Sequence, residues 1–147
     1  LSGRGPSFSA GGDLLEFGSH PDPVTAHAVR SARNAGRLLS HCRNRVRAEV
    51  HGACIGAGAE LSAFAAFVVA KPDTFFQLPE LSMGLVPGAG GTVSIPRRIG
   101  RQRAAYMALT GVRIDGSDPN TASNSSTSMP DRSDPAERYL KATSDEE

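Results

Sequence analysis

Two isolated carboxylates, Glu60 and Glu80, are the residues in this sequence best suited to acid–base chemistry. Each is the only charged side chain in a run of apolar residues and glycines, GACIGAGAELSAFAAF around Glu60 and LPELSMGLVPGAGGT around Glu80. Carboxylates are seldom buried without a partner, and apolar surroundings raise carboxyl pKa values. General acid and base catalysis near neutral pH needs such raised values. The pattern favours a catalytic pair.

A plainer interpretation stays open for each acid. Glu60 stands at the start of an apolar helix, where an acid that complements the helix dipole contributes about 0.3 to 1 kcal/mol. Glu80 follows Pro79, whose ring fixes φ near about −65°, so a strand-end acid turned to solvent is the other interpretation. The residues alone do not choose between these roles.

The glycine turn GLVPGAGGT is not a phosphate-binding loop. A P-loop needs Gly-Lys-Ser/Thr, and no Lys follows Lys71 before Arg97. The dinucleotide pattern GxGxxG fails because Gly88 and Gly90 are followed by Val93 where the third glycine belongs. The pattern instead indicates a tight turn that lets a ligand or another backbone approach closely.

The elements that must position these residues alternate between helix and strand. The spacing predicts one amphipathic helix from Thr25 to Cys42, with its arginines in solvent, and a short helix in AELSAFAAF. VRAEVHG alternates as a half-buried strand, whereas FVVA and TFFQL indicate buried strands. We expect a loop over Gly52 to Gly58, then a last helix from Arg101 to Leu109 capped by Gly111. The alternation predicts an α/β fold.

Composition narrows the function classes. The formal charge of +1 and 5% aromatic residues disfavour nucleic acid as a partner. No apolar run reaches the roughly 20 residues that span a bilayer, and no signal peptide opens the chain, so we expect a cytoplasmic protein. Cys42 and Cys54 fit no metal-ligand spacing, which predicts reduced thiols and no metal.

The composition also changes along the chain. Composition predicts one folded core over residues 1–115. Residues 116–147 are rich in Ser, Asp, Asn and Pro, which predicts a polar, disordered tail. The strand expected before the first glycine loop, SFSAGGDL, is barely present. We therefore expect a fragment, truncated at both ends.

Taken in order, three motifs resemble the crotonase superfamily of enoyl-CoA hydratases and isomerases: SFSAGGDL, HGACIGAGAEL and LPELSMGLVPGAGGT. The resemblance covers about residues 1–115 and implies a fold of repeated ββα units. It implies a thioester oxyanion hole built by the backbone N–H groups of Ala10 and Ala57. The substrate-binding positions that it implies are Ala10, Gly11, Gly12, Asp13, Ala57, Pro87 and Gly88.

The same resemblance places Glu60 as the base that activates water for attack at C3 and Glu80 as the acid that exchanges a proton at C2. It implies an acyl-CoA thioester as partner, no cofactor beyond the coenzyme A of the substrate, and homotrimers or hexamers among full-length relatives. Because both acids are present, hydration of a trans-2-enoyl-CoA is the first expectation. Double-bond isomerisation, or non-catalytic binding of acyl-CoA or a partner subunit, stays open. We expect the chain alone to be weakly active or inactive.

Overall fold

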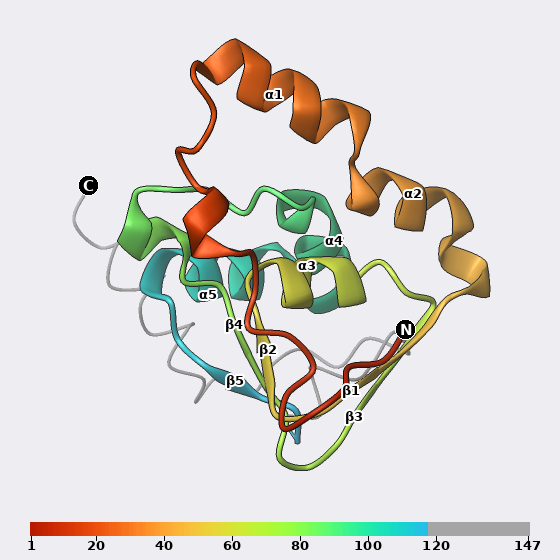
Figure 1. The fold of residues 1–147 in the computed structure, drawn as a ribbon. Helices are drawn as coiled ribbons and strands as arrows, with labels where there is room; N and C mark the ends of the chain where they lie inside the picture. Colours follow the sequence, from red (N-terminus) through yellow and green to blue (C-terminus); the bar gives the residue numbers. More distant parts are fainter. Residues whose placement is uncertain (118–147) are drawn as a thin grey trace.

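The computed structural model describes residues 1–117, in which short strands and helices alternate (Figure 1). The first half contains η1 (Leu14–Glu16), α1 (Pro23–Ala32), α2 (Ala35–Cys42), η2 (Arg43–Arg45), β1 (Arg47–Val50), β2 (Ala53–Ile55) and α3 (Ala57–Ser62). The second half contains β3 (Phe67–Ala70), β4 (Phe75–Gln77), η3 (Glu80–Met83), α4 (Gly91–Ile99), α5 (Arg101–Thr110) and β5 (Ile114–Asp115). The predicted α/β class is confirmed.

Two strands followed by a helix form the repeating unit of the fold. In one sheet β1 pairs in parallel with β3, and in the other β2 pairs in parallel with β4, which β5 joins antiparallel. The first residues follow the same path, because Ser2 bridges to Glu49 beside β1 and Ser9 bridges to Cys54 beside β2. The ββα repeat expected from the resemblance is therefore present.

Gly52 turns the chain from the first sheet into the second. Its φ is +55°, in the left-handed region, and a Cβ at this position would lie 2.4 Å from the Pro6 carbonyl oxygen. A side chain there would meet backbone that cannot easily move, so the corner between β1 and β2 requires glycine.

The core lies between the strands and helices α3, α4 and α5, on one side of the second sheet (Figure 1). Its buried apolar side chains are Ala48, Val50, Cys54, Ala59, Ala65, Phe76, Leu78, Ile95, Ala104 and Met107. Ala48 and Val50 alternate with the exposed Arg47 and Glu49, so the half-buried strand predicted from VRAEVHG is confirmed.

The single helix predicted from Thr25 to Cys42 is wrong, because the chain breaks at Arg33 and Asn34. Arg33 leaves helical geometry at φ −116° and ψ 45°, and Asn34 begins α2 by accepting a 2.7 Å hydrogen bond from the Arg37 N–H. An asparagine cap offers the backbone an alternative to continued helix.

The expected apolar face of this region is also largely exposed. The side chains of Val24 and Leu38 are 78% and 69% exposed, and the buried residue of α2 is Gly36, which packs against Ala89. Figure 1 shows α1 and α2 above α3 and α4, away from both sheets. Arg30, the single arginine of α1, is exposed.

Two strand expectations also need correction. Residues Ala53–Ile55, inside the expected loop, form β2, because β4 supplies hydrogen-bonding partners that no local pattern encodes. β3 is not a buried strand, since Phe67 on one of its faces is 70% exposed. The strand expected in TFFQL is confirmed as β4.

Helix α4 begins directly at the glycine turn and was not expected from the sequence. It contains Pro96, which normally disfavours a helix interior, but it packs against α3 and α5. The following helix, α5, agrees with the prediction, and Gly111 ends it in the left-handed region by donating to the Met107 carbonyl.

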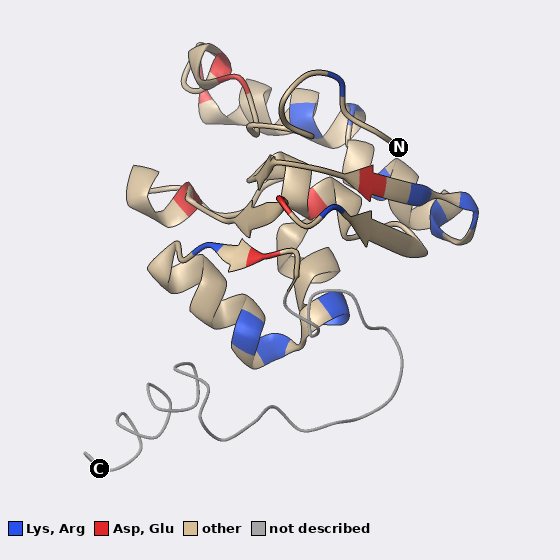
Figure 2. Ribbon diagram, turned by 90° about the horizontal axis from the view of Figure 1, so that it is seen from below, with Lys and Arg blue, Asp and Glu red and all other residues tan. Residues whose placement is uncertain are grey.

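Most of the expected polar tail lies outside residues 1–117, although the Gly116 N–H, at its start, donates to the Thr74 carbonyl oxygen at 2.7 Å. Within the described residues no helix has the length and apolar character to cross a membrane. Figure 2 shows basic and acidic residues in several separate places along the ribbon, which agrees with the formal charge of +1.

Candidate active site

Glu60 lies in the first turn of α3, and its carboxylate is held by the glycine turn. The side chain is 2% exposed, and its Oε2 accepts hydrogen bonds from the Ala89 N–H at 2.8 Å and the Gly91 N–H at 2.6 Å. The Ser94 hydroxyl donates to the Glu60 carbonyl oxygen at 2.7 Å. The glycine turn therefore fixes one carboxylate oxygen and leaves Oε1 without a hydrogen bond among the described residues.

Glu80 reaches the same region from the end of β4, the strand that pairs in parallel with β2. It begins η3 directly after Pro79, is 9% exposed, and its Oε1 lies 2.8 Å from the position that a Cβ on Gly56 would take. Its Oε2 is buried and has no hydrogen-bond partner within residues 1–117. A buried oxygen without a partner is costly for structure alone and is a common mark of catalytic groups.

Both carboxyl groups have pKa values above the ordinary range of a glutamate. Burial is the main cause at Glu60, where the charge of Glu80 adds to the increase and the N–H groups of Gly91, Ala89 and Gly88 oppose it. Burial is also the main cause at Glu80, opposed only by its own backbone N–H. Burial therefore moves the pKa of each acid upward, as expected for groups that exchange protons near neutral pH, whereas the N–H groups directed at Glu60 stabilise its carboxylate form.

The N–H groups of Ala10 and Ala57 are available as donors. Ala57 is the first residue of α3, where a backbone N–H has no partner inside the helix, and Ala10 follows the bridge between Ser9 and Cys54. Within residues 1–117 neither group donates a hydrogen bond. Two unengaged N–H groups in one cavity are what a developing oxyanion requires.

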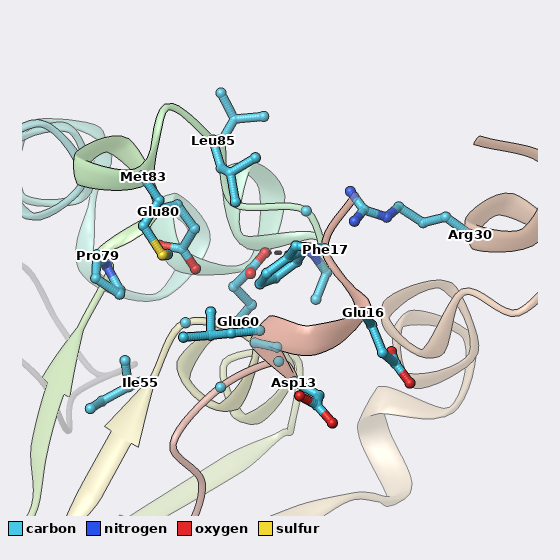
Figure 3. A pocket seen from close by; sticks show the side chains of 18 of the residues that line it. Asp13, Glu16, Phe17, Arg30, Ile55, Glu60, Pro79, Glu80, Met83 and Leu85 are labelled. Carbon is cyan, nitrogen blue, oxygen red and sulfur yellow. Dashed lines mark hydrogen bonds between the residues drawn. The ribbon is translucent and has the colours of Figure 1, made fainter. Parts of the chain in front are cut away.

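One cavity of about 410 Å³ brings these groups together (Figure 3). Of the residues expected to bind substrate, it is lined by Ala10, Gly11, Gly12, Asp13, Ala57 and Gly88, together with Glu60 and Glu80. Pro87 does not line it. His51, which stands just before the second glycine loop, contacts the Gly5 carbonyl oxygen instead.

The cavity also contains side chains that the sequence did not single out. Apolar groups of Phe17, Ile55, Met83 and Leu85 border it. Arg30 also borders it while remaining exposed to solvent, as the sequence predicted. No periodicity marks these residues, because they come from η1, α1, β2 and the η3 region, which meet only in the folded chain. Within residues 1–117 no three His, Cys, Asp or Glu side chains group as metal ligands.

Comparison with known proteins gives a consistent result. Residues 1–125 match the family model described as Enoyl-CoA hydratase/isomerase. The chain is 35% identical over 121 residues to a mevalonyl-coenzyme A hydratase from Aspergillus fumigatus and 34% identical to a mitochondrial 3-hydroxyisobutyryl-CoA hydrolase from Xenopus laevis. These matches cover 80% of this chain but 43% and 31% of the relatives, so the chain spans less than half of their lengths.

The structure of this chain is also similar to a solved structure. The enoyl-CoA hydratase from Thermoplasma volcanium matches with a TM-score of 0.74 and 30% sequence identity, over 98% of this chain and 56% of that one. The three glycine-containing motifs, the ββα repeat and the matched family model agree. The chain belongs to the enoyl-CoA hydratase/isomerase family, within the crotonase superfamily.

Proposed function

We propose that this chain carries the catalytic acids of an enzyme that adds water across the 2,3 double bond of a trans-2-enoyl-CoA. The observation that carries the proposal is the meeting of Glu60 and Glu80, both buried and both with raised carboxyl pKa values, in one cavity with the free N–H groups of Ala10 and Ala57. The names of the relatives, a hydratase and a hydrolase of CoA thioesters, support an acyl-CoA substrate.

The proposed reaction uses the N–H groups first. The thioester oxygen accepts hydrogen bonds from Ala10 and Ala57, which stabilise the negative charge that forms as C2 gains enolate character. The fixed geometry of these donors means that little reorganisation is needed when the charge develops. The apolar wall formed by Phe17, Ile55 and Met83 excludes water from the rest of the acyl group.

The two acids then divide the proton transfers. Glu60 Oε1, which makes no hydrogen bond among the described residues, accepts a proton from a water as the water oxygen bonds to C3. Glu80 gives its proton to C2, and a proton passed between the two carboxyl groups restores their starting states. This chemistry needs no cofactor beyond the coenzyme A of the substrate.

The test is hydration of crotonyl-CoA, followed by the loss of enoyl-thioester ultraviolet absorbance. Glu60→Gln and Glu80→Gln should each abolish the reaction, whereas Glu16→Gln, an exposed acid at the cavity edge, is the matched control. An unchanged rate in either of the first two variants would contradict the acid assignment.

Double-bond isomerisation is the second candidate, because it moves one proton between C2 and C4 and needs no activated water. The free Oε1 of Glu60 favours hydration over isomerisation. Offering both a trans-3-enoyl-CoA and crotonyl-CoA to the unmodified chain separates the two: isomerisation of the first without hydration of the second would make isomerisation the main activity. An isomerase rate retained in Glu60→Gln would then identify Glu80 as the proton carrier.

Assembly into trimers or hexamers is a further part of the proposal. The exposed apolar side chains of Phe67 and Leu109 support it, since apolar side chains gain stability when a contact between copies removes them from water. The mass of the particle in solution, measured by light scattering, tests this part independently of catalysis.

A further inference from the structure

Arg30 places a guanidinium against the loop that holds the catalytic Glu60. It lies in the last turn of α1, and its Nη1 is 2.8 Å from the position that a Cβ on Gly88 would take. Gly88 directly precedes Ala89, whose N–H binds the Glu60 carboxylate. Arg30 therefore reaches the cavity from a helix that contributes neither catalytic acid.

Gly88 is suited to this position because it has no side chain. Its φ lies outside the left-handed region, unlike that of Gly90 at +107°, so its backbone conformation does not itself call for glycine. The missing side chain leaves room for the Arg30 guanidinium to lie against the backbone. The loop thus accommodates a cation beside Glu60.

Among the described residues, no side chain neutralises the guanidinium. Within residues 1–117 Arg30 forms no ion pair and no hydrogen bond, although Asp13 and Glu16 line the same cavity. Figure 3 shows the carboxylates of Asp13 and Glu16 pointing away from Arg30, and Asp13 Oδ1 accepts from the Leu15 N–H at 2.9 Å. Arg33 lines the cavity as well, so this end of the cavity carries two guanidinium groups. A guanidinium that the described residues leave unpaired is suited to an anion supplied by a ligand.

The position of Arg30 indicates which part of a ligand it meets. In the view of Figure 3 Glu60 is drawn between Glu80 and Arg30, and the ring of Phe17 is drawn between Glu60 and the guanidinium. In the proposed reaction Glu80 acts at C2 and Glu60 at C3. A group that continues past C3 therefore extends toward Arg30.

We propose, on the basis of the proposed function, that Arg30 binds a carboxylate at the far end of the acyl group. The preferred substrate is then the CoA monothioester of an unsaturated dicarboxylic acid. The planar guanidinium presents paired N–H groups that match a carboxylate, whereas a neutral alkyl tail gains nothing from it. Arg30 is in this role a specificity-determining residue.

The experiment compares crotonyl-CoA with the CoA monothioester of trans-pent-2-enedioic acid, whose carboxylate follows one methylene beyond C3. Dissociation constants are measured by titration calorimetry for the unmodified chain, Arg30→Gln and the control Arg37→Gln, which removes the same charge from α2 outside the cavity. The ratio of the two constants is the readout. Arg30→Gln should reduce the preference for the dicarboxylic thioester about 10- to 100-fold, and Arg37→Gln should leave it unchanged.

Phosphate-free pantetheine thioesters of both acids identify the source of the anion. If Arg30 binds the acyl carboxylate, the loss of preference persists with them. If Arg30→Gln weakens both CoA thioesters equally and has no effect on the pantetheine thioesters, Arg30 binds a phosphate of coenzyme A, and the proposal is overturned.

The experiments distinguish failure of the proposed hydratase function from failure of the proposed role of Arg30. Binding and hydration of crotonyl-CoA without any Arg30-dependent preference would reject the role of Arg30 alone. Absence of both binding and hydration for crotonyl-CoA would reject the proposed function, and the inference with it.

Discussion

The Gly91 N–H donates a 2.6 Å hydrogen bond to Glu60 Oε2, and no side chain fits between these two residues. A Cβ on Gly91 would lie 2.6 Å from Glu60 Cγ, closer than nonbonded carbon atoms approach. The first residue of α4 is therefore glycine because a carboxylate from α3 occupies the space. This contact joins the second and third motifs into one site.

Gly91→Ala should destabilise the fold and displace Glu60. Within a helix, glycine to alanine ordinarily stabilises by about 0.5 to 1 kcal/mol, but here the added methyl overlaps a buried side chain, which typically costs about 1 to 3 kcal/mol. Urea denaturation measures the free energy of unfolding. The neighbouring Thr92→Ala, at an exposed position, is the control, and a gain in stability for Gly91→Ala would contradict the contact.

The raised carboxyl pKa of Glu80 predicts a pH-dependent stability with a defined sign. The folded state holds this proton more tightly than the unfolded chain, whose carboxyl titrates near 4.5. The free energy of unfolding contributed by Glu80 therefore falls as pH rises from about 4.5 through the raised pKa. Glu80→Gln removes the titration, so the variant should lose less stability than the unmodified chain over this window.

Urea denaturation at several pH values from 4 to 8 measures the difference between the two proteins. Glu16→Gln, which removes an exposed carboxylate, should reproduce the unmodified profile. If instead the unmodified chain lost more free energy of unfolding than Glu80→Gln as pH fell, the Glu80 pKa would be shifted in the opposite direction.

Ala57→Pro should remove one of the two proposed oxyanion donors while keeping the fold. Ala57 is the first residue of α3, a position where proline is tolerated because its N–H has no partner within the helix. Loss of one such donor typically lowers kcat about 100- to 1,000-fold. The kinetics of enoyl-CoA hydration and a thermal melt measure activity and fold separately.

Arg101→Pro is the matched control for this substitution. Arg101 is the first residue of α5, also preceded by a glycine, and lies outside the cavity. Its variant should keep the hydration rate. Equal losses in both variants would show that proline acts through the helices and not through the donor.

Arg98 should contribute far more to stability than its neighbour Arg97. Arg98 is partly buried and donates through Nε to the Ala63 carbonyl oxygen at 3.2 Å, and through its terminal nitrogen to that of Ala65, closing the end of α3. Arg97 is exposed. Arg98→Ala leaves two partly buried carbonyl groups without donors, an expected loss of about 1 to 3 kcal/mol, whereas Arg97→Ala should change the free energy of unfolding by less than about 0.5 kcal/mol.

The local pattern of the sequence was sufficient to identify the acidic residues of the site and some of the elements around them. Glu60 and Glu80 stand out because each is the only charge in an apolar run, and the missing Lys and third glycine excluded a phosphate loop. The alternation around Ala48 and Val50 predicted β1, and Gly111 predicted the end of α5. These features depend on neighbours in the chain, so they are visible without a structure.

The tertiary structure decided how those pieces meet. That Ala89 and Gly91 bind the Glu60 carboxylate, and that Glu80 Oε2 is left without a partner among the described residues, follows from the packing of α3 against α4 and η3. The periodicity that predicted one solvated helix could not show that Asn34 interrupts it or that Arg30 reaches the cavity. Periodicity records which face of an element is apolar, whereas the contacts of a side chain depend on where distant segments lie, and only the folded chain fixes that.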